Sequence, residues 1–262
     1  MTGAAILGVR LACRDVAAVR AFWVTAFGAV ANGEGLRLGP QRLDLVPATE
    51  AGGAPPLSNE TGFQHCAIVV ADMDAAMARL AATTGWSPIS ESGPERLPEA
   101  SGGVTAFKFR DPEGHPLEFL QFPATRVPDA WGRARAGPCL GIDHSAIGVA
   151  EAERSIAFYR QLGFRLASRQ INRGPEQGRL DGLGDGTVVE VVTLACEGGS
   201  RPHLELLCYQ RPVPVARPAR DGSPYATVLV CEAAGHEAGP VADPDGHRFW
   251  CGGGGSQSAK PN

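Results

Sequence analysis

Two short segments of the chain share one pattern, a run of small and apolar residues with a histidine near its start. The segments are FQHCAIVV at residues 63–70 and IDHSAIGV at residues 142–149. Each is typical of a buried strand. Because a strand directs alternate side chains to opposite faces, the histidine can face a cavity while its neighbours fill a core. An acidic residue and a helical pattern follow each segment, AAMARLAATTG in the first case and RSIAFYRQLGF in the second.

Each of these two units ends in a strand with a glutamate at its centre. PLEFL carries Glu118 and HLELL carries Glu205. A carboxylate inside an apolar strand is costly to bury unless it is paired or bound to a metal. A histidine and a glutamate that recur at the same places of a repeat therefore indicate a metal site more strongly than two unrelated core residues would.

The same order of elements can be followed through the whole chain as four βαβββ units, of which the first and the last are degenerate. The units are aligned on the acidic residue that follows each first strand. The equivalent positions of the first strands are then Gly8, His65, His144 and Tyr225. Those of the last strands are Asp44, Glu118, Glu205 and Trp250. Within the degenerate units only Asp44 could bind a metal, and it lacks a histidine partner. The turn DPEG recurs as DPDG in the fourth unit, which has almost no room for a helix.

Segments rich in Pro, Gly and Ala suggest where the chain divides. We expect a first domain over residues 1–122, a linker over 123–140, a second domain over 141–252 and a flexible tail over 253–262. The segment 172–185 is expected to be a long polar loop between two strands.

Composition narrows the class of partner. With 24 basic and 28 acidic residues, a net charge of -4 and no basic patch, the chain is not expected to bind nucleic acid. No apolar run approaches the length of a membrane span, and the N-terminus lacks the pattern of a signal peptide. The seven cysteines include no CxxC pair, which favours free thiols in a reducing compartment. We therefore expect a cytoplasmic protein with a small-molecule substrate, and a homodimer is left open.

In combination, three motifs resemble the vicinal oxygen chelate superfamily, which includes glyoxalase I, methylmalonyl-CoA epimerase, extradiol dioxygenases and the fosfomycin and bleomycin resistance proteins. The motifs are FQHCAIVVADMDAA, DPEGHPLEF and IDHSAIGV with the later AFYRQLGF. The resemblance covers nearly all of residues 5–252. It implies an α+β fold in which four βαβββ modules form two cupped mixed sheets. It also implies one divalent metal in a cup, held by side chains of the first and last strands, and the positions that match are His65, Glu118, His144 and Glu205.

The pairing of the units decides where these ligands meet. The superfamily includes two arrangements. In the first, unit one pairs with unit two and unit three with unit four. In the second, unit two pairs with unit three and unit one with unit four. Only the second arrangement gathers both histidines and both glutamates in one cup, and a functional metal needs three or four converging ligands. We therefore expect units two and three to share a cup, and we expect Trp250 to fill a second, metal-free cup.

Two imidazoles and two carboxylates suit Ni, Co, Mn, Fe or Zn. Such an ion can chelate a substrate with two adjacent oxygens and acidify the neighbouring C–H bond, while Glu118 or Glu205 takes the proton. The resemblance thus implies a glyoxalase-like isomerase or lyase. Asn172, Gln177 and Arg179 are candidate substrate contacts at the mouth of the cup, although a solvated loop explains them equally well.

Two other functions stay open. An extradiol ring-cleaving dioxygenase needs two histidines and one carboxylate in one cup, and a non-enzymatic binder of small molecules needs no complete ligand set. Three further histidines lie near these motifs. His115 and His247 are expected to be exposed beside their turns, whereas His203 shares the parity of Glu205 and is either exposed or close to the site.

Overall fold

The computed structural model describes residues 4–132, 137–196, 201–218, 222–233 and 238–252. The first unit consists of β1 (Ala5–Cys13), α1 (Val16–Phe27), β2 (Val30–Asn32), β3 (Gly35–Leu38) and β4 (Gln41–Pro47). The second consists of β5 (Gln64–Val70), α2 (Met73–Ala81), β6 (Ser87–Pro88), β7 (Glu95–Arg96), the short 3-10 helix η1 (Glu99–Ser101), β8 (Thr105–Arg110) and β9 (Pro116–Gln121).

The short helix α3 (Asp129–Gly132) follows the second unit. The third unit consists of β10 (Cys139–Gly148), α4 (Ala152–Gln161), β11 (Arg165–Arg173), α5 (Pro175–Asp181), β12 (Val188–Ala195) and β13 (His203–Arg211). The fourth consists of β14 (Thr227–Glu232), β15 (Gly239–Ala242) and β16 (Arg248–Gly252), and its described residues include no helix. The α+β class and the four-unit order expected from the sequence are confirmed.

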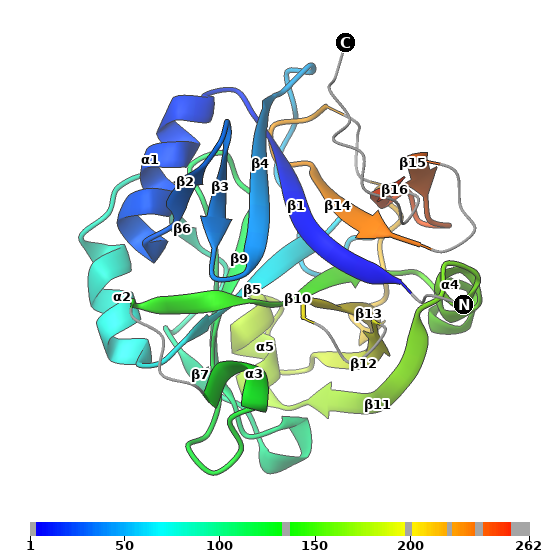
Figure 1. The fold of residues 1–262 in the computed structure, drawn as a ribbon. Coiled ribbons are helices and arrows are strands. Elements are labelled where there is room, and N and C mark those ends of the chain that lie inside the picture. The colour runs from blue at the N-terminus through cyan, green and yellow to red at the C-terminus, as the bar shows by residue number, and fades with distance from the viewer. Residues whose placement is uncertain (1–3, 133–136, 197–200, 219–221, 234–237, 253–262) are drawn as a thin grey trace.

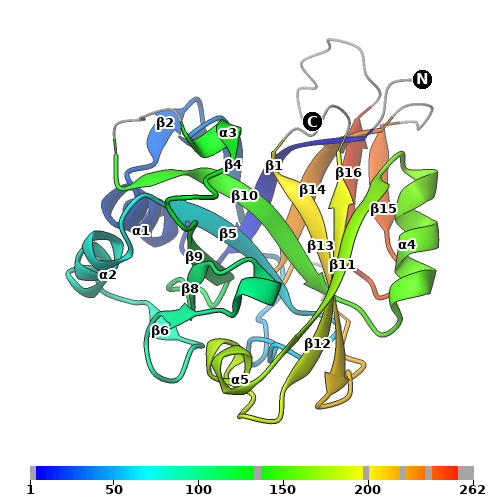
Figure 2. The same cartoon turned by 90° about the horizontal axis from the view of Figure 1, so that it is seen from below.

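Two sheets result, and each combines units that are not consecutive. The nine-stranded sheet joins units two and three in the order β11-β12-β13-β10-β5-β9-β8-β6, with β7 paired to β8. The seven-stranded sheet joins units one and four in the order β15-β16-β14-β1-β4-β3-β2. The antiparallel pair β5–β10 lies at the middle of the molecule, with α1 and α2 to one side and α4 to the other (Figures 1 and 2). The expected pairing of unit two with unit three is therefore confirmed.

Local sequence explains where the first two helices begin. The carboxylate of Asp15 accepts the backbone N–H of Ala18, and that of Asp72 accepts the backbone N–H of Ala75. Both are N-caps, which satisfy backbone donors that the first helical turn leaves unpaired. The helix α1 ends at Gly28, whose φ of 73° lies in the left-handed region that glycine adopts without strain.

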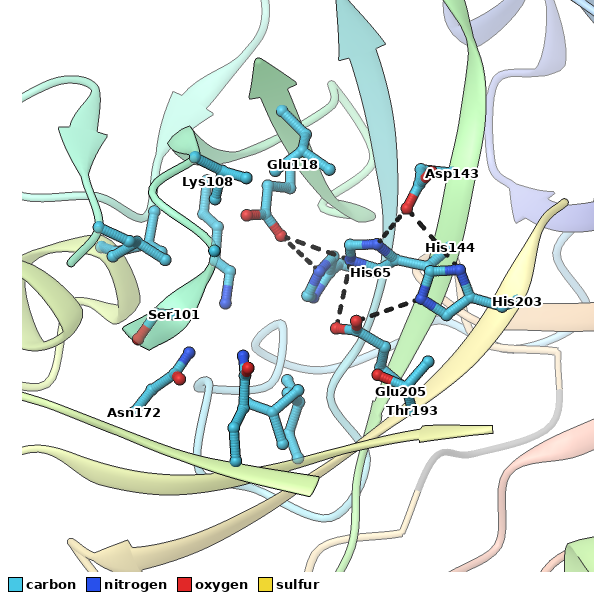
Figure 3. A pocket seen from close by; sticks show the side chains of 18 of the residues that line it. His65, Ser101, Lys108, Glu118, Asp143, His144, Asn172, Thr193, His203 and Glu205 are labelled. Carbon is cyan, nitrogen blue, oxygen red and sulfur yellow. Dashed lines mark hydrogen bonds and ion pairs between the residues drawn. The ribbon is translucent and has the colours of Figure 1, made fainter. Parts of the chain in front are cut away.

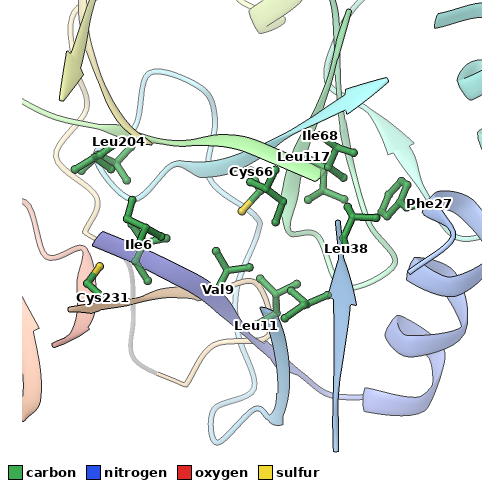
Figure 4. Packing of buried hydrophobic residues seen from close by; sticks show 14 of the residues in the cluster. Ile6, Val9, Leu11, Phe27, Leu38, Cys66, Ile68, Leu117, Leu204 and Cys231 are labelled. Carbon is green, nitrogen blue, oxygen red and sulfur yellow. The ribbon is translucent and has the colours of Figure 1, made fainter. Parts of the chain in front are cut away.

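The main core fills the space between the two sheets. Val9 and Leu11 of β1 face Cys66 and Ile68 of β5, and Phe27 of α1 closes one side (Figure 4). Every residue of β5 and of β10 is buried. One face of each central strand therefore packs into this core, and the other is left for a cavity.

Three expectations about loops and turns are wrong. The segment 172–185 is not a long loop, because β11 continues to Arg173 and α5 occupies Pro175–Asp181. His115 and His247 are buried instead of exposed. The Nε2 atom of His115 donates to the carbonyl of Ala12, and that of His247 donates to the carbonyl of Gly148. Each turn thus fastens its hairpin to a first strand of a neighbouring unit, a contact that the local sequence does not reveal.

Candidate metal and substrate site

The concave face of the nine-stranded sheet encloses a cavity of about 290 Å³. Strands of units two and three form its floor, and α5 and η1 lie at its rim. Its polar lining includes all four positions expected to bind the metal, together with several residues of neighbouring strands: His65, Lys108, Glu118, Asp143, His144, Asn172, Gln177, Thr193, His203 and Glu205. Most of these are labelled in Figure 3.

The sheet register brings the two histidines and the two glutamates together. In each unit the glutamate pairs with the residue two places after the histidine, Ala67 opposite Glu118 and Ala146 opposite Glu205. Because side chains two residues apart share one face of a strand, each histidine points to the same side as its glutamate. The antiparallel pairing of β5 with β10 then places the rings of His65 and His144 with centroids 5.6 Å apart.

The closest of these contacts is between His65 and Glu118. The His65 Nε2 atom lies 2.7 Å from Glu118 Oε2, but neither ring nitrogen of His65 has a hydrogen-bond partner among the described residues. A buried imidazole without hydrogen bonds is uncommon. Two donor atoms that approach without a hydrogen bond are arranged as ligands of one cation are, so this pair fits a metal.

The ring of His144 is held in place from behind. Its Nδ1 atom lies 3.3 Å from Asp143 Oδ2, which leaves Nε2 to face the cavity. The Asp143 carboxylate also accepts hydrogen bonds from Trp131 Nε1 at 2.7 Å and from Arg201 Nη1 at 3.0 Å. A carboxylate behind a histidine is the usual arrangement in metal sites, since it fixes the tautomer and raises the basicity of the ligand. In the sequence, the only sign that Asp143 orients His144 is its place directly before the histidine in IDHSAIGV.

The remaining carboxylate, Glu205, lies beside the other three groups. Its Oε2 atom is 3.6 Å from His144 Nε2, and its Oε1 atom accepts a hydrogen bond of 3.2 Å from His203 Nε2. The side chain of Glu205 is 19% exposed and that of Glu118 8%. Glu205 is therefore the more accessible carboxylate. His203 is buried beside it, which settles the alternative that the sequence left open.

The distances fit one ion of ordinary size. Donor atoms bound at about 2.0–2.2 Å to the same ion can be at most about 4.4 Å apart. The Nε2 atom of His144 is 3.9 Å from Glu118 Oε2, and the ligand atoms of His65, Glu118 and His144 all lie within 4.8 Å of one another. His65, Glu118 and His144 therefore form one group of possible metal ligands, and Glu205 lies beside it.

Opposite charges in the cavity set the protonation states of the metal-free protein. Burial alone would lower the pKa of His144, but Glu205 and Asp143 outweigh it and raise this pKa to about 9. Burial, followed by the charge of Lys108, lowers the pKa of His65. Burial would raise the pKa of Glu205, but the nearby His144 holds it well below its usual range. The metal-free site thus contains ionised carboxylates and a neutral His65, which are the forms that bind cations, whereas His144 carries a proton that it must release to bind a metal.

Lys108, like Asp143, is a residue of this site that the sequence motifs do not identify. It lies on β8 directly opposite Glu118 on β9, is almost fully buried, and forms an ion pair of 2.6 Å with Asp181. Burial would lower its pKa, but Asp181 and Glu118 raise it above the usual value, so the amine is charged. The signal was present: a lysine in an apolar strand, joined by a tight hairpin to the strand of Glu118.

The three expected substrate contacts do not lie together. Asn172 and Gln177 line the cavity and are buried. Arg179 is not part of the lining, since its guanidinium forms two hydrogen bonds with the carboxylate of Glu95, at 2.7 and 2.8 Å. The structure therefore does not support the role expected for Arg179. Gln177 and Arg179 are two residues apart on α5, which places them on opposite sides of the helix. Only the side that bears Gln177 faces the cavity.

The seven-stranded sheet has no equivalent site in its described residues, because both clusters of possible metal ligands belong to the cavity above. The carboxylate of Asp44 lies 2.6 Å from Arg42 and 3.8 Å from Arg10, and it lines a separate hollow of about 490 Å³. Trp250 does not line this hollow and is 39% exposed. The expectation that Trp250 fills the second cup is therefore wrong.

The alignment of the fourth unit also needs a correction. Trp250 pairs with Val230, so the position two residues earlier on β14, which corresponds to the histidines, is Val228. When Glu232 is taken as the acidic residue that follows the first strand of this unit, Tyr225 falls at that position instead. In the structure Glu232 is the last residue of β14, whereas the corresponding acidic residues of the other units follow their first strands.

Comparison with known proteins assigns the family. Two models of the Glyoxalase/Bleomycin resistance protein/Dioxygenase superfamily match the chain, one over residues 5–119 and the other over residues 64–182. The chain belongs to this superfamily. No curated protein matched it in sequence. None of the helices in the described ranges has the length and apolar character needed to cross a bilayer.

Solved structures of this superfamily show the same fold. Glyoxalase I from Zea mays superposes with a TM-score of 0.62 and 17% sequence identity, over 95% of this chain and 92% of that one. A putative dioxygenase from Bacillus subtilis superposes with a TM-score of 0.54 and 12% identity, over 95% of this chain and 85% of that one. At these identities the likeness concerns the fold and not the reaction.

Proposed function

We propose that the chain is a divalent-metal-dependent isomerase or lyase of the glyoxalase type, acting on a small substrate with two vicinal oxygens. The observation that carries the proposal is the convergence of His65, Glu118 and His144, with Glu205 adjacent, in one buried cavity. The bound ion would be one of Ni, Co, Mn, Fe or Zn, because imidazole and carboxylate ligands suit these metals. When bound, it would supply Lewis acidity to the substrate oxygens.

The residues divide the work according to their contacts. Asp143 orients His144, and Lys108 keeps Glu118 ionised. His144 and Glu118 therefore serve as fixed ligands. Burial would raise the pKa of Glu118, but the charge of Lys108 lowers it. Glu205 is the more exposed carboxylate and has a hydrogen-bonding neighbour in His203, so we assign it the proton transfer at the substrate carbon. Apolar side chains, among them Leu120 and Leu207, complete the lining of the cavity.

A second function, extradiol ring cleavage, is favoured by one observation. The cluster of His65, Glu118 and His144 consists of two histidines and one carboxylate, which is the ligand set of non-haem Fe(II) oxygenases. The sequence left this reaction open on the condition that two histidines and one carboxylate share one cup. Units two and three share one sheet, which is consistent with that condition.

One experiment separates these functions. The purified protein is analysed for bound metal and then assayed, with each of the five metals, against α-hydroxyketones, methylglyoxal–thiol adducts and catechols. Isomerisation without consumption of dioxygen supports the proposed function. Iron-dependent consumption of dioxygen with opening of a catechol ring supports the second. Substrate binding that is independent of metal and unaffected by alanine at His65, Glu118, His144 or Glu205 would contradict both and indicate a non-enzymatic binder.

A further inference from the structure

The cavity contains a buried cation that the proposed chemistry uses only indirectly. Lys108 extends from β8 toward the space between Glu118 and Asn172 (Figure 3). Its Nζ atom donates a hydrogen bond of 2.6 Å to Asp181, the last residue of α5. An ammonium group has three N–H donors. Among the described residues Asp181 is the one acceptor of this group, so two donors remain for the cavity.

The partner of Lys108 lies behind the cavity wall. Asp181 is buried and does not line the cavity, and its second oxygen accepts a hydrogen bond of 2.7 Å from Gln177 Nε2. The carboxylate therefore holds the ammonium group from behind. The other cation of the lining, Arg201, differs in this respect. Its partner Asp143 lines the same cavity, so the pair of Arg201 and Asp143 exposes both charges to the cavity. The pair of Lys108 and Asp181 exposes only the positive charge.

Two amide side chains surround the ammonium group. Asn172 of β11 points its polar end into the same part of the cavity as Lys108 (Figure 3). The Oδ1 atom of Asn172 and the Oε1 atom of Gln177 are buried without hydrogen-bond partners in the described part of the chain. Buried polar atoms normally have partners. Both amide oxygens are acceptors, so they suit an O–H or N–H donor of a ligand, whereas Lys108 offers N–H donors. The three side chains thus form a subsite with unmet hydrogen-bonding capacity beside the four metal-binding positions.

We propose that this subsite binds a carboxylate group of the substrate, at the end remote from the vicinal oxygens, with Lys108 as the residue that selects it. The inference rests on the proposed function, since that function supplies the vicinal oxygens. The single ammonium group matches a monoanion, and an ionised acceptor makes the stronger kind of hydrogen bond. The two amide oxygens can accept only from a donor of the substrate, such as a hydroxyl group beside the carboxylate. A cavity of about 290 Å³ also restricts the substrate to a compact molecule.

A matched pair of rigid ligands tests the inference. 3,4-Dihydroxybenzoate carries vicinal oxygens at one end and a carboxylate at the other, and 3,4-dihydroxybenzamide replaces the carboxylate by a neutral group of the same shape. Both are titrated by calorimetry into the zinc-loaded protein, because zinc is redox-inert and the ligands are not turned over. We expect wild type to bind the benzoate about ten to a hundred times more tightly, the ratio typical of a hydrogen bond to a charged group.

Three variants assign that preference. Lys108→Met should abolish it when the samples are compared at equal zinc content, and Arg179→Met should retain it, because Arg179 is a nearby cation outside the cavity. Lys108→Met leaves Asp181 buried without its partner and can fail to fold. The double variant Lys108→Met/Asp181→Asn removes both charges and should likewise lose the preference.

The outcomes separate the inference from the proposed function. Equal binding of the two ligands by wild type, or a preference that survives in both Lys108 variants, overturns the inference even if zinc is bound. Failure of wild type to bind zinc overturns the proposed function. In that case the zinc-free protein is titrated with 4-hydroxybenzoate and 4-hydroxybenzamide, and a missing preference for the acid overturns the inference as well.

Discussion

His65 and Glu118 approach to 2.7 Å between Nε2 and Oε2 without the geometry of a hydrogen bond. The two residues are on adjacent parallel strands, and the register of those strands, not a local interaction, sets their distance. A shared cation would satisfy both groups, and the strand register would then hold two of its ligands in place.

Removing this imidazole should empty the site. We expect His65→Ala to lose the bound divalent ion and the activity together, measured as metal per chain after dialysis and as turnover. Asp44→Ala is the matched control, because Asp44 is the carboxylate at the equivalent position of the other sheet and pairs with Arg42. It should retain one ion per chain. A wild-type stoichiometry of two ions, one of them lost in Asp44→Ala, would contradict a single metal site.

The two glutamates should differ when each is changed to glutamine. Glu118→Gln should mainly lose metal, because this carboxylate is enclosed by His65 and Lys108. Glu205→Gln should keep much of the metal and lose about a hundredfold to ten-thousandfold in turnover, the usual contribution of a general base. Metal content and kcat are measured on the same samples. Loss of metal in Glu205→Gln with little loss in Glu118→Gln would reverse the two roles.

The buried turn histidines should matter for stability rather than for chemistry. The Nδ1 atom of His115 lies 2.8 Å from Asp111 Oδ2, so His115→Ala removes the partner of this buried oxygen and leaves the buried carbonyl of Ala12 unpaired. The other carboxylate oxygen of Asp111 keeps its backbone N–H donors. We expect a loss of about 3 kcal/mol in the free energy of unfolding, measured by urea denaturation. His247→Ala is the matched variant at the equivalent turn of the fourth unit. Its Nδ1 atom has no partner among the described residues, so a smaller loss is expected. Equal effects of under about 0.5 kcal/mol would contradict these roles.

Stability should fall at alkaline pH because of buried thiols. Burial raises the pKa of Cys13 and of Cys139 from 9.0 to about 12. Between these values the unfolded chain releases protons that the folded chain keeps, so the free energy of unfolding decreases as pH rises from 9 to 12. The urea midpoint should decline over this range, and the decline should be shallower in Cys13→Ala/Cys139→Ala. An unchanged slope in that variant would assign the effect to other groups.

Several features of the fold could be predicted because they repeat. The position of each histidine relative to its glutamate depends on strand register, and a register that occurs twice in one chain is visible without a structure. The pairing of units two and three could be predicted as well, since only this arrangement gathers His65 and His144 in one cup. Both expectations depend on positions along strands, where side-chain direction follows from parity.

The features that could not be predicted depend on contacts between distant segments. The helix α5 contains Gly178, which weakens helix propensity, and it forms because its buried face packs against β7, β8 and β11. The burial of His115 depends on β1, more than 100 residues away along the chain. Asp181 meets Lys108 across 73 positions. None of these contacts leaves a periodic signal in the local sequence.

The pairing of β5 with β10 makes the site bipartite. One histidine and one glutamate come from each half of the chain, and the two halves meet along a strand pair that neither half can form alone. A polypeptide cut between residues 132 and 137 would thus yield two pieces, each with half of a ligand set. Metal binding in such a mixture would report reassociation of the pieces, which makes this protein suited to fragment complementation.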